Sequence, residues 1–116
     1  MTLSEYIEKL PPEFTVLNRS ENTDSITLTK IFCCDLLSFA MARNPHGSVW
    51  VTVMGNINSI AVMELTDGGC LVLAENAAID EKSLDKAREN DITVIRTELP
   101  VFEAADLSNK LINHQK

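Results

Sequence analysis

The side chains best suited to chemistry or ligand contact lie where four predicted strands end. They are Cys34, Asp35, Gly55, Asn56, Asn58, Glu75, Asn76 and Thr97. Gly55 and Asn56 open a predicted helix, and the backbone amides of a helix N-terminus attract anions. Together with the side chain of Asn58, this turn could therefore contact a phosphate, a carboxylate or a nucleobase. The structural alternative is that Gly55 adopts a positive φ and that Asn56 or Asn58 caps the helix.

Cysteine chemistry is a second possibility. Cys34 precedes a predicted helix N-terminus, where the helix dipole lowers the pKa of a thiol, whereas the neighbouring Asp35 favours the protonated form. The alternative is an inert, packed thiol. Adjacent cysteines at 33 and 34 cannot easily both bind one tetrahedral ion, and the sequence has no C-x-x-C, so we predict neither a metal site nor a disulfide framework. His46, in a turn, and His114, near the C-terminus, are expected to be solvent-exposed.

Carboxylates also follow the strand ends. Asp35, Glu75 and Glu98 could include a pair that faces one cleft and acts as general acid and base. The alternative is that each one caps a helix or is solvated. An acidic cleft favours a ligand with hydroxyl groups, a base or a bound cation over a bare anion. The sequence contains neither G-x-x-x-x-G-K-[ST] nor G-x-G-x-x-G, so it lacks both common phosphate-binding loops.

The hydrophobic pattern predicts strands and helices that alternate along the chain. We expect helices over 3–10, 36–43, 57–65, 80–90 and 101–112, and strands over 14–17, 26–33, 49–54, 70–74 and 92–95. Thr2 and Glu5 form a capping box, and Asp35 and Asp80 are the predicted N-caps of their helices. Gly68 and Gly69 suit the end of the third helix. Residues 18–25 are polar and are expected to form an exposed loop.

Four of these strands are each followed by a helix long enough for a parallel crossover. We therefore predict a single α/β domain over residues 1–116, with a mostly parallel sheet and helices on both faces. In such sheets ligands bind beyond the carboxyl ends of the strands, near a switch in strand order. This rule is the reason for placing the candidate site at the strand ends.

Composition excludes two classes of partner. The chain has 10 Lys and Arg against 17 Asp and Glu, a net charge of −7, and no stretch that gathers basic residues. Binding to nucleic acid through phosphate neutralisation is therefore not expected. No apolar run reaches the roughly 20 residues that span a bilayer, and the N-terminus does not resemble a signal peptide. We expect a soluble, cytoplasmic protein without a membrane partner.

Three segments, 31–41, 50–62 and 92–98, resemble the DRTGG domain in a stand-alone form. The resemblance implies the fold of the N-terminal domain of HPr kinase/phosphatase and a homodimer. In larger proteins the DRTGG domain accompanies CBS nucleotide-sensing domains in a regulated pyrophosphatase, and some stand-alone copies are encoded among iron-only hydrogenase components. The chain departs from the family at two places: residues 55–57 replace its Asp-Arg pair, and residues 74–76 replace its Thr-Gly-Gly.

These observations favour a non-catalytic regulatory or accessory module, without a cofactor, that binds a small nucleotide-like or phosphorylated metabolite at the strand ends. Two alternatives stay open. One is a subunit-interface or scaffold protein of a redox, hydrogenase-type complex, whose partner is another protein. The other is a small enzyme that uses Cys34 or the Asp35/Glu75 pair.

Overall fold

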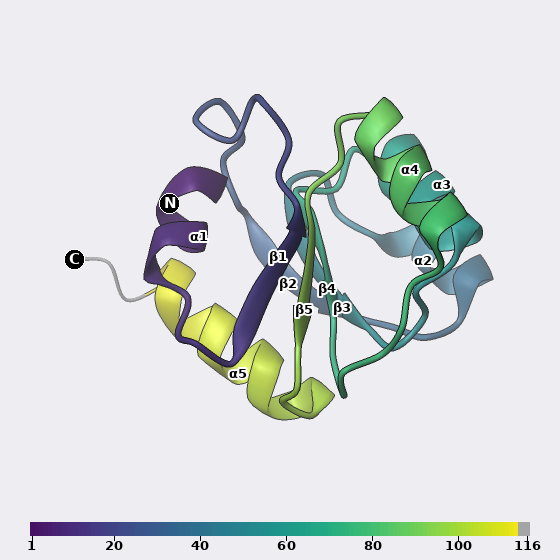
Figure 1. The fold of residues 1–116 in the computed structure, drawn as a ribbon. Coiled ribbons are helices and arrows are strands. Elements are labelled where there is room, and N and C mark those ends of the chain that lie inside the picture. Colours follow the sequence, from purple (N-terminus) through teal and green to yellow (C-terminus); the bar gives the residue numbers. More distant parts are fainter. Residues whose placement is uncertain (114–116) are drawn as a thin grey trace.

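A five-stranded sheet forms the middle layer of the molecule (Figure 1). The structure is a computed structural model that describes residues 1–113, so His114 lies outside the described part. The elements in chain order are α1 (Leu3–Lys9), β1 (Phe14–Asn18), β2 (Lys30–Cys33), α2 (Leu37–Arg43), β3 (Ser48–Thr52), α3 (Ile57–Thr66), β4 (Cys70–Leu73), α4 (Glu81–Glu89), β5 (Val94–Thr97) and α5 (Val101–Asn113). The predicted α/β class and the order of elements are confirmed.

The strand order is β1-β5-β4-β3-β2. Strands β2 to β5 are parallel neighbours in chain order, and β1 pairs antiparallel with β5 at one edge. Because each right-handed crossover leads to the next strand along, α2, α3 and α4 all lie on the same face. The parallel part of the sheet therefore has no switch in strand order, and the expected landmark for a ligand site is missing.

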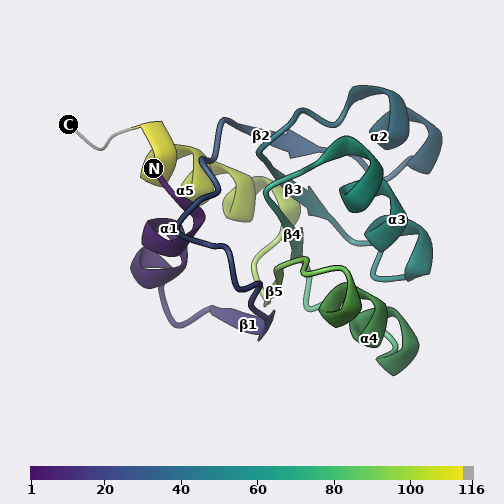
Figure 2. The same cartoon turned by 90° about the horizontal axis from the view of Figure 1, so that it is seen from above.

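Helices cover both faces of the sheet, as Figure 2 shows from above. Side chains alternate along each strand, so neighbouring residues of β3 enter different cores. Val49 and Val51 pack toward α1 and α5, whereas Trp50 packs toward α2, α3 and α4, and all three are fully buried. On the first face the hydroxyls of Tyr6 and Ser108 lie 2.7 Å apart and join α1 to α5. The predicted capping box of Thr2 and Glu5 begins α1.

Residues 18–25 are exposed at five of their eight positions, as their polarity predicted, but Asn18 still belongs to β1 and two of the side chains are buried. Ser20 and Thr23 are buried. The backbone amide of Ser20 donates to the Thr93 hydroxyl at 3.0 Å, and that of Glu21 donates to the Asp91 carboxylate at 2.8 Å. These backbone hydrogen bonds attach the segment to the residues that precede β5.

Two further predictions need correction. The strand predicted over 26–33 is regular only from Lys30, because residues 26 and 28 instead make backbone hydrogen bonds with the N-terminal residues. The apolar spacing at residues 57, 60, 61, 62 and 65 predicts the buried face of α3, but Ile57 and Leu65 are exposed, while Ser59 and Met63 are buried. The left-handed residue that ends α3 is Asp67, with φ of 56°, and neither following glycine has a positive φ.

Candidate functional site

All eight predicted site residues lie at the carboxyl edge of the parallel strands. Cys34 and Asp35 follow β2, Gly55 and Asn56 follow β3, Asn58 is in the first turn of α3, Glu75 and Asn76 follow β4, and Thr97 ends β5. Backbone hydrogen bonds link the last two loops, because the amides of Glu75 and Asn76 donate to the carbonyls of Leu99 and Thr97 at 2.9 and 2.8 Å. The edge is thus one continuous surface built from four consecutive strand ends.

Asp35 does not cap α2, contrary to the prediction. Helix α2 begins after Leu36 without a side-chain cap. Oδ1 of Asp35 instead accepts from the Thr52 hydroxyl at 2.6 Å and from the Val53 amide at 3.0 Å. The carboxylate bridges to the end of the neighbouring strand, where unpaired donors were available. One oxygen of Asp35 is therefore engaged in holding β2 and β3 together.

The cysteines at the end of β2 differ in their surroundings. The carbonyl of Cys34 accepts from the indole Nε1 of Trp50 at 2.9 Å, which fixes the backbone at this position. Partial burial and the nearby charge of Asp35 raise the pKa of the Cys33 thiol. Burial raises the pKa of Cys70 in the core. All three thiols are free, and the high pKa of Cys33 and Cys70 disfavours their thiolates.

Gly55 has a steric role different from the predicted one. Its φ is not positive. A Cβ at this position would lie 2.3 Å from the carbonyl oxygen of Ala78, because Gly55 forms a parallel bridge with Ile79. The next prediction is confirmed: Oδ1 of Asn56 caps α3, accepting from the amides of Asn58 and Ser59 at 2.9 and 3.2 Å. Glycine is therefore required for close packing between this turn and the segment before α4.

The turn after β4 has an uncommon backbone. Glu75 and Asn76 have φ values of 57° and 55°, and the amide of Ala77 donates to the carbonyl of Ala74 at 3.0 Å. Two left-handed central residues with this hydrogen bond are typical of a type I′ turn. Two glycines, as in the Thr-Gly-Gly of the DRTGG domain that the sequence resembles, would fit the same conformation without a Cβ. The turn shape is thus compatible with a Gly-Gly pair although the residues differ.

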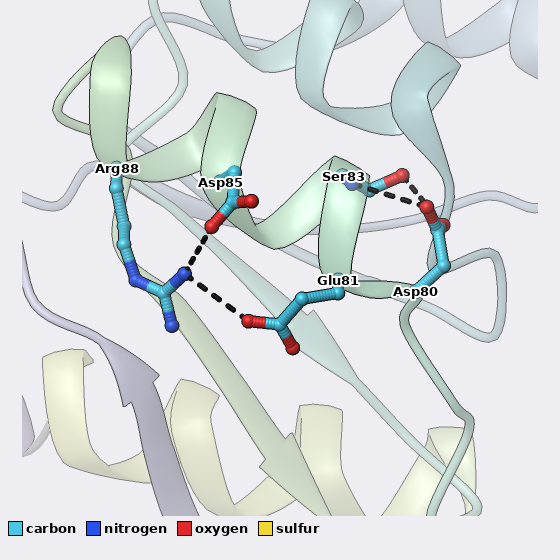
Figure 3. Close-up of polar contacts among 5 residues, drawn as sticks. All are labelled: Asp80, Glu81, Ser83, Asp85 and Arg88. Atoms are coloured by element: carbon cyan, nitrogen blue, oxygen red, sulfur yellow. Dashed lines mark hydrogen bonds and ion pairs between the residues drawn. The ribbon is translucent and has the colours of Figure 1, made fainter.

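Helix α4 starts at the same edge with a strong N-cap (Figure 3). Asp80 accepts from the hydroxyl and the amide of Ser83, at 2.6 and 3.1 Å. These two hydrogen bonds lower the pKa of Asp80. Farther along the helix, Arg88 donates to Asp85 at 2.6 Å and approaches Glu81 at 3.5 Å. The predicted cap at Asp80 is confirmed.

The Asp80 cap contributes to the pH dependence of the free energy of unfolding. Its pKa is lower in the folded chain than in the unfolded chain, so the ionised cap stabilises the fold at neutral pH and this contribution is lost as the pH falls through the folded pKa. In Asp80→Asn, which keeps an acceptor but cannot titrate, we expect the free energy of unfolding to fall less steeply below about pH 4. Urea unfolding between pH 7 and pH 3 measures this. Equal slopes in Asp80→Asn and the wild type would contradict it, with Glu103→Gln as the control for removing one carboxylate.

The charged residues in the loops of the carboxyl edge are all acidic, although Arg96 lies one residue before Thr97 in β5 and Lys82 lies in the first turn of α4. The loops that follow the four strands contain Asp35, Glu75, Asp80 and Glu98 and contain no Lys or Arg. Their backbone amides are largely engaged by the protein, as described for residues 74–77 and 58–59. Among residues 1–113, no group of three or more His, Cys, Asp or Glu is arranged to hold a metal ion. The groups that these loops and the first turn of α3 offer to a ligand are therefore carboxylates and the side-chain amides of Asn58 and Asn76.

Apolar side chains are exposed beside these polar groups. Leu36 directly follows Asp35, which accepts a hydrogen bond from the amide of Val53, and Ile57 lies in the first turn of α3. Phe39, on α2, has an exposed fraction of 55%, and that of Leu36 is 58%. We call Leu36, Phe39, Val53 and Ile57 the apolar margin of the carboxyl edge.

A cavity of about 500 Å³ lies at the opposite, amino edge of the sheet. It is formed by loops that precede the strands, including residues 25–27, 29, 46–47, 67–69 and 90–92, and by the last turns of α3. This cavity was not predicted, because Gly68 and Gly69 were interpreted only as the end of a helix. No helix within residues 1–113 has the length and apolarity needed to cross a membrane.

Comparison with known proteins gives a likeness of fold. No protein-family model matches the sequence, and no curated protein has a significantly similar sequence. A similar solved structure is that of the CBS and DRTGG domains of the regulatory region of Clostridium perfringens pyrophosphatase, complexed with activator, diadenosine tetraphosphate. The TM-score is 0.72 at 16% sequence identity. The match covers 92% of this chain but only 45% of that chain. At this identity the likeness concerns the fold, which is of the type found in a CBS- and DRTGG-containing regulatory region.

Proposed function

We propose that this chain is a DRTGG-type regulatory or accessory module that binds a small nucleotide-like metabolite at the carboxyl edge of its sheet. The observation that carries the proposal is the shared fold: 92% of the chain matches part of a regulatory region that was crystallised with a nucleotide activator. The segments that resemble the DRTGG domain support the same family. We place the protein in the cytoplasm and assign it no catalytic step.

The chemical groups at the carboxyl edge limit the kinds of ligand that could bind there. Four carboxylates and no basic side chain in its loops disfavour a bare phosphate, since like charges repel at short range. The amides of Asn58 and Asn76 can each donate and accept, which suits the edge of a nucleobase or the hydroxyls of a ribose. Phosphates would then point to solvent or carry a divalent cation. The proposed ligand is therefore recognised mainly through its base and sugar.

The alternative of a small enzyme has less support. One oxygen of Asp35 already accepts two hydrogen bonds from the end of β3, which fits a structural carboxylate. Oδ1 of Asn56 is likewise occupied by the start of α3. These engaged groups favour a binding surface over an acid–base pair.

A thermal-shift panel tests the proposed binding. A ligand at 100 times its Kd adds about 2.7 kcal/mol to the free energy of unfolding, which raises the Tm of a domain of this size by several degrees. We expect such a shift with adenosine or guanosine nucleotides, and we expect a nucleoside to retain much of the effect without its phosphates. The panel includes each nucleotide with and without Mg²⁺.

Matched variants test whether the ligand-induced rise in Tm comes from binding at the carboxyl edge. Asn76→Gly removes a side-chain amide at a residue whose φ of 55° glycine adopts freely, and Asn58→Ala removes an exposed amide without touching the Asn56 cap. Both are expected to reduce the ligand-induced shift, whereas Asn109→Ala on α5 should leave it intact. No shift with any nucleotide, or equal shifts in all three variants, would contradict the proposal.

The apolar margin supports a second candidate function, a subunit interface between two copies of this chain. Leu36, Phe39, Val53 and Ile57 are all exposed, and exposed apolar groups of this kind are enriched at protein contacts. The resemblance to a usually dimeric family agrees with this role. An interface here would lie beside the proposed ligand site and could report on its occupancy.

Sedimentation equilibrium tests the interface. We expect the wild type to form a dimer and the double variant Phe39→Ser/Ile57→Ser to be monomeric, because both side chains are already exposed and their replacement removes little core packing. The exposed Phe102 on α5, replaced by Ser, is the control and should leave the dimer unchanged. A monomeric wild type, or a double variant that remains dimeric, would rule out this surface.

A further inference from the structure

The cavity at the amino edge is separate from the proposed nucleotide site, which lies at the other end of the strands. Its walls come from four parts of the chain: the strap over residues 22–29, the turn at 46–47, the end of α3 with residues 67–69, and residues 90–92. Hydrogen bonds hold the strap in place, since the amide of Thr29 donates to the carbonyl of Gly47 at 2.9 Å and its hydroxyl donates to that of His46 at 2.7 Å. At about 500 Å³ the cavity has the volume of a small-molecule site.

Several polar side chains converge on this cavity without serving the fold. Asn22, Ser25, Thr27, Glu64 and Asn90 line it. Within residues 1–113 none of these five side chains makes a hydrogen bond or an ion pair with another side chain or with the backbone. Ile26, Met63 and Ile92 supply apolar wall. The cavity thus combines hydrogen-bonding groups that are available to a ligand with a smaller apolar surface.

The charges around the cavity indicate which sign of charge a ligand should carry. Glu64, Asp67 and Asp91 line it, and no Lys or Arg does. Helix α3 also directs its C-terminal end toward it, and the last turn of that helix carries no basic residue to offset the negative end of the dipole. His46 pairs with Asp67 at 2.9 Å, and a neighbouring groove places Arg19 and Arg88 near Asp91. Of the three carboxylates, Glu64 therefore has the fewest basic side chains near it.

We propose that the cavity at the amino edge binds a small organic amine with two or more amino groups. Ammonium groups would be held by Glu64 and by the carbonyl groups at the end of α3, and further N–H groups would donate to the oxygens of Ser25, Thr27 and Asn90. A metal ion is a poorer fit, since no group of three or more His, Cys, Asp or Glu in the described chain is arranged to hold one. An anionic ligand would meet only carboxylates and the negative end of a helix.

Isothermal titration calorimetry with spermidine and putrescine tests this site. We expect saturable binding to the wild type and a loss of about tenfold in affinity in Glu64→Gln, because one charged hydrogen bond is removed. Thr27→Val should weaken binding by a smaller factor. Both positions are exposed, so neither change is expected to disturb folding, and an unchanged Tm of each free variant verifies this.

A matched control separates the site from diffuse attraction to an acidic protein. Glu103→Gln on α5 changes the net charge as much as Glu64→Gln does, and Glu103 does not line the cavity. We expect spermidine to bind Glu103→Gln as it binds the wild type. Equal weakening in the two variants, or an absence of saturable binding to the wild type, would overturn the proposal.

Discussion

Trp50→Ala is expected to lower the free energy of unfolding by about 3 to 5 kcal/mol, the usual cost of truncating a buried aromatic side chain. Trp50 is fully buried between β3 and the layer of α2, α3 and α4. Its indole also donates to the carbonyl of Cys34, so the truncation removes the donor that fixes the end of β2. For a domain of this size the Tm should fall by on the order of 15 °C. Because small domains are only marginally stable, a loss of this size removes a large share of the free energy of unfolding.

Urea unfolding followed by circular dichroism measures this change, because the variant lacks the only tryptophan of the chain. Trp50→Phe is the matched control. It keeps most of the apolar volume but leaves the carbonyl of Cys34 without its indole partner, so an intermediate loss is expected. A loss below about 1 kcal/mol in Trp50→Ala would show that α2, α3 and α4 repack to fill the space left by the indole. That result would contradict close packing around Trp50.

Gly55→Ala is expected to cost about 2 to 3 kcal/mol, at the upper end of the range for overpacking. The added Cβ would lie 2.3 Å from the carbonyl oxygen of Ala78 and 3.1 Å from Cβ of Ile79. The first of these contacts is with backbone, which cannot rotate away, so the whole segment before α4 must shift. The variant should therefore also disturb the carboxyl edge on which the proposed ligand depends.

Gly68→Ala provides a matched comparison for Gly55→Ala. Its added Cβ would also be crowded, at 2.8 Å from Sδ of Met63 and 2.9 Å from Nδ2 of Asn44, but both are atoms of side chains that can move. We expect a clearly smaller loss in the midpoint of chemical unfolding for Gly68→Ala. If the two variants lost equal stability, the backbone contact at Ala78 would not be the cause of the Gly55 effect.

The sequence analysis predicted the elements well where their hydrophobic pattern was strong. Strands β3 and β4 are almost continuous apolar runs, and the α/β class with its parallel crossovers follows from the four strand–helix repeats. The caps at Thr2, Asn56 and Asp80 were predictable because each interaction spans only three residues. Local interactions of this kind can be recognised in the sequence alone.

The errors share one physical origin, which is competition from residues far apart in the sequence. Asp35 was available to cap α2, but the end of β3 offers it two donors that no local pattern reveals. Ser20 is polar, yet Thr93 satisfies it in the interior. Gly55 needs its small size because of Ala78, a residue 23 positions later in the chain. Interactions of this kind depend on strand order, which the sequence did not reveal.

The gathering of the candidate site residues at one edge was predictable, but the chemical groups that they leave free for a ligand were not. The rule that ligands bind at the carboxyl ends of parallel strands brought Asp35, Gly55, Glu75 and Thr97 to one edge. The engagement of most backbone amides there, and the cavity at the amino edge, depend on how loops from different repeats meet. These features determine which chemical groups face a ligand at each of the two proposed sites.

The most direct test of the central proposal is a titration of the ¹⁵N-labelled protein with diadenosine tetraphosphate and Mg²⁺, followed by two-dimensional NMR. The account predicts saturable chemical-shift changes in the loops at 34–36, 53–58, 74–77 and 97–99, reduced in Asn76→Gly and retained in Asn109→Ala. The cavity at the amino edge should remain unperturbed by this ligand. Spectra that do not change, or changes confined to residues outside these four loops, would contradict the proposal that the carboxyl edge binds nucleotides.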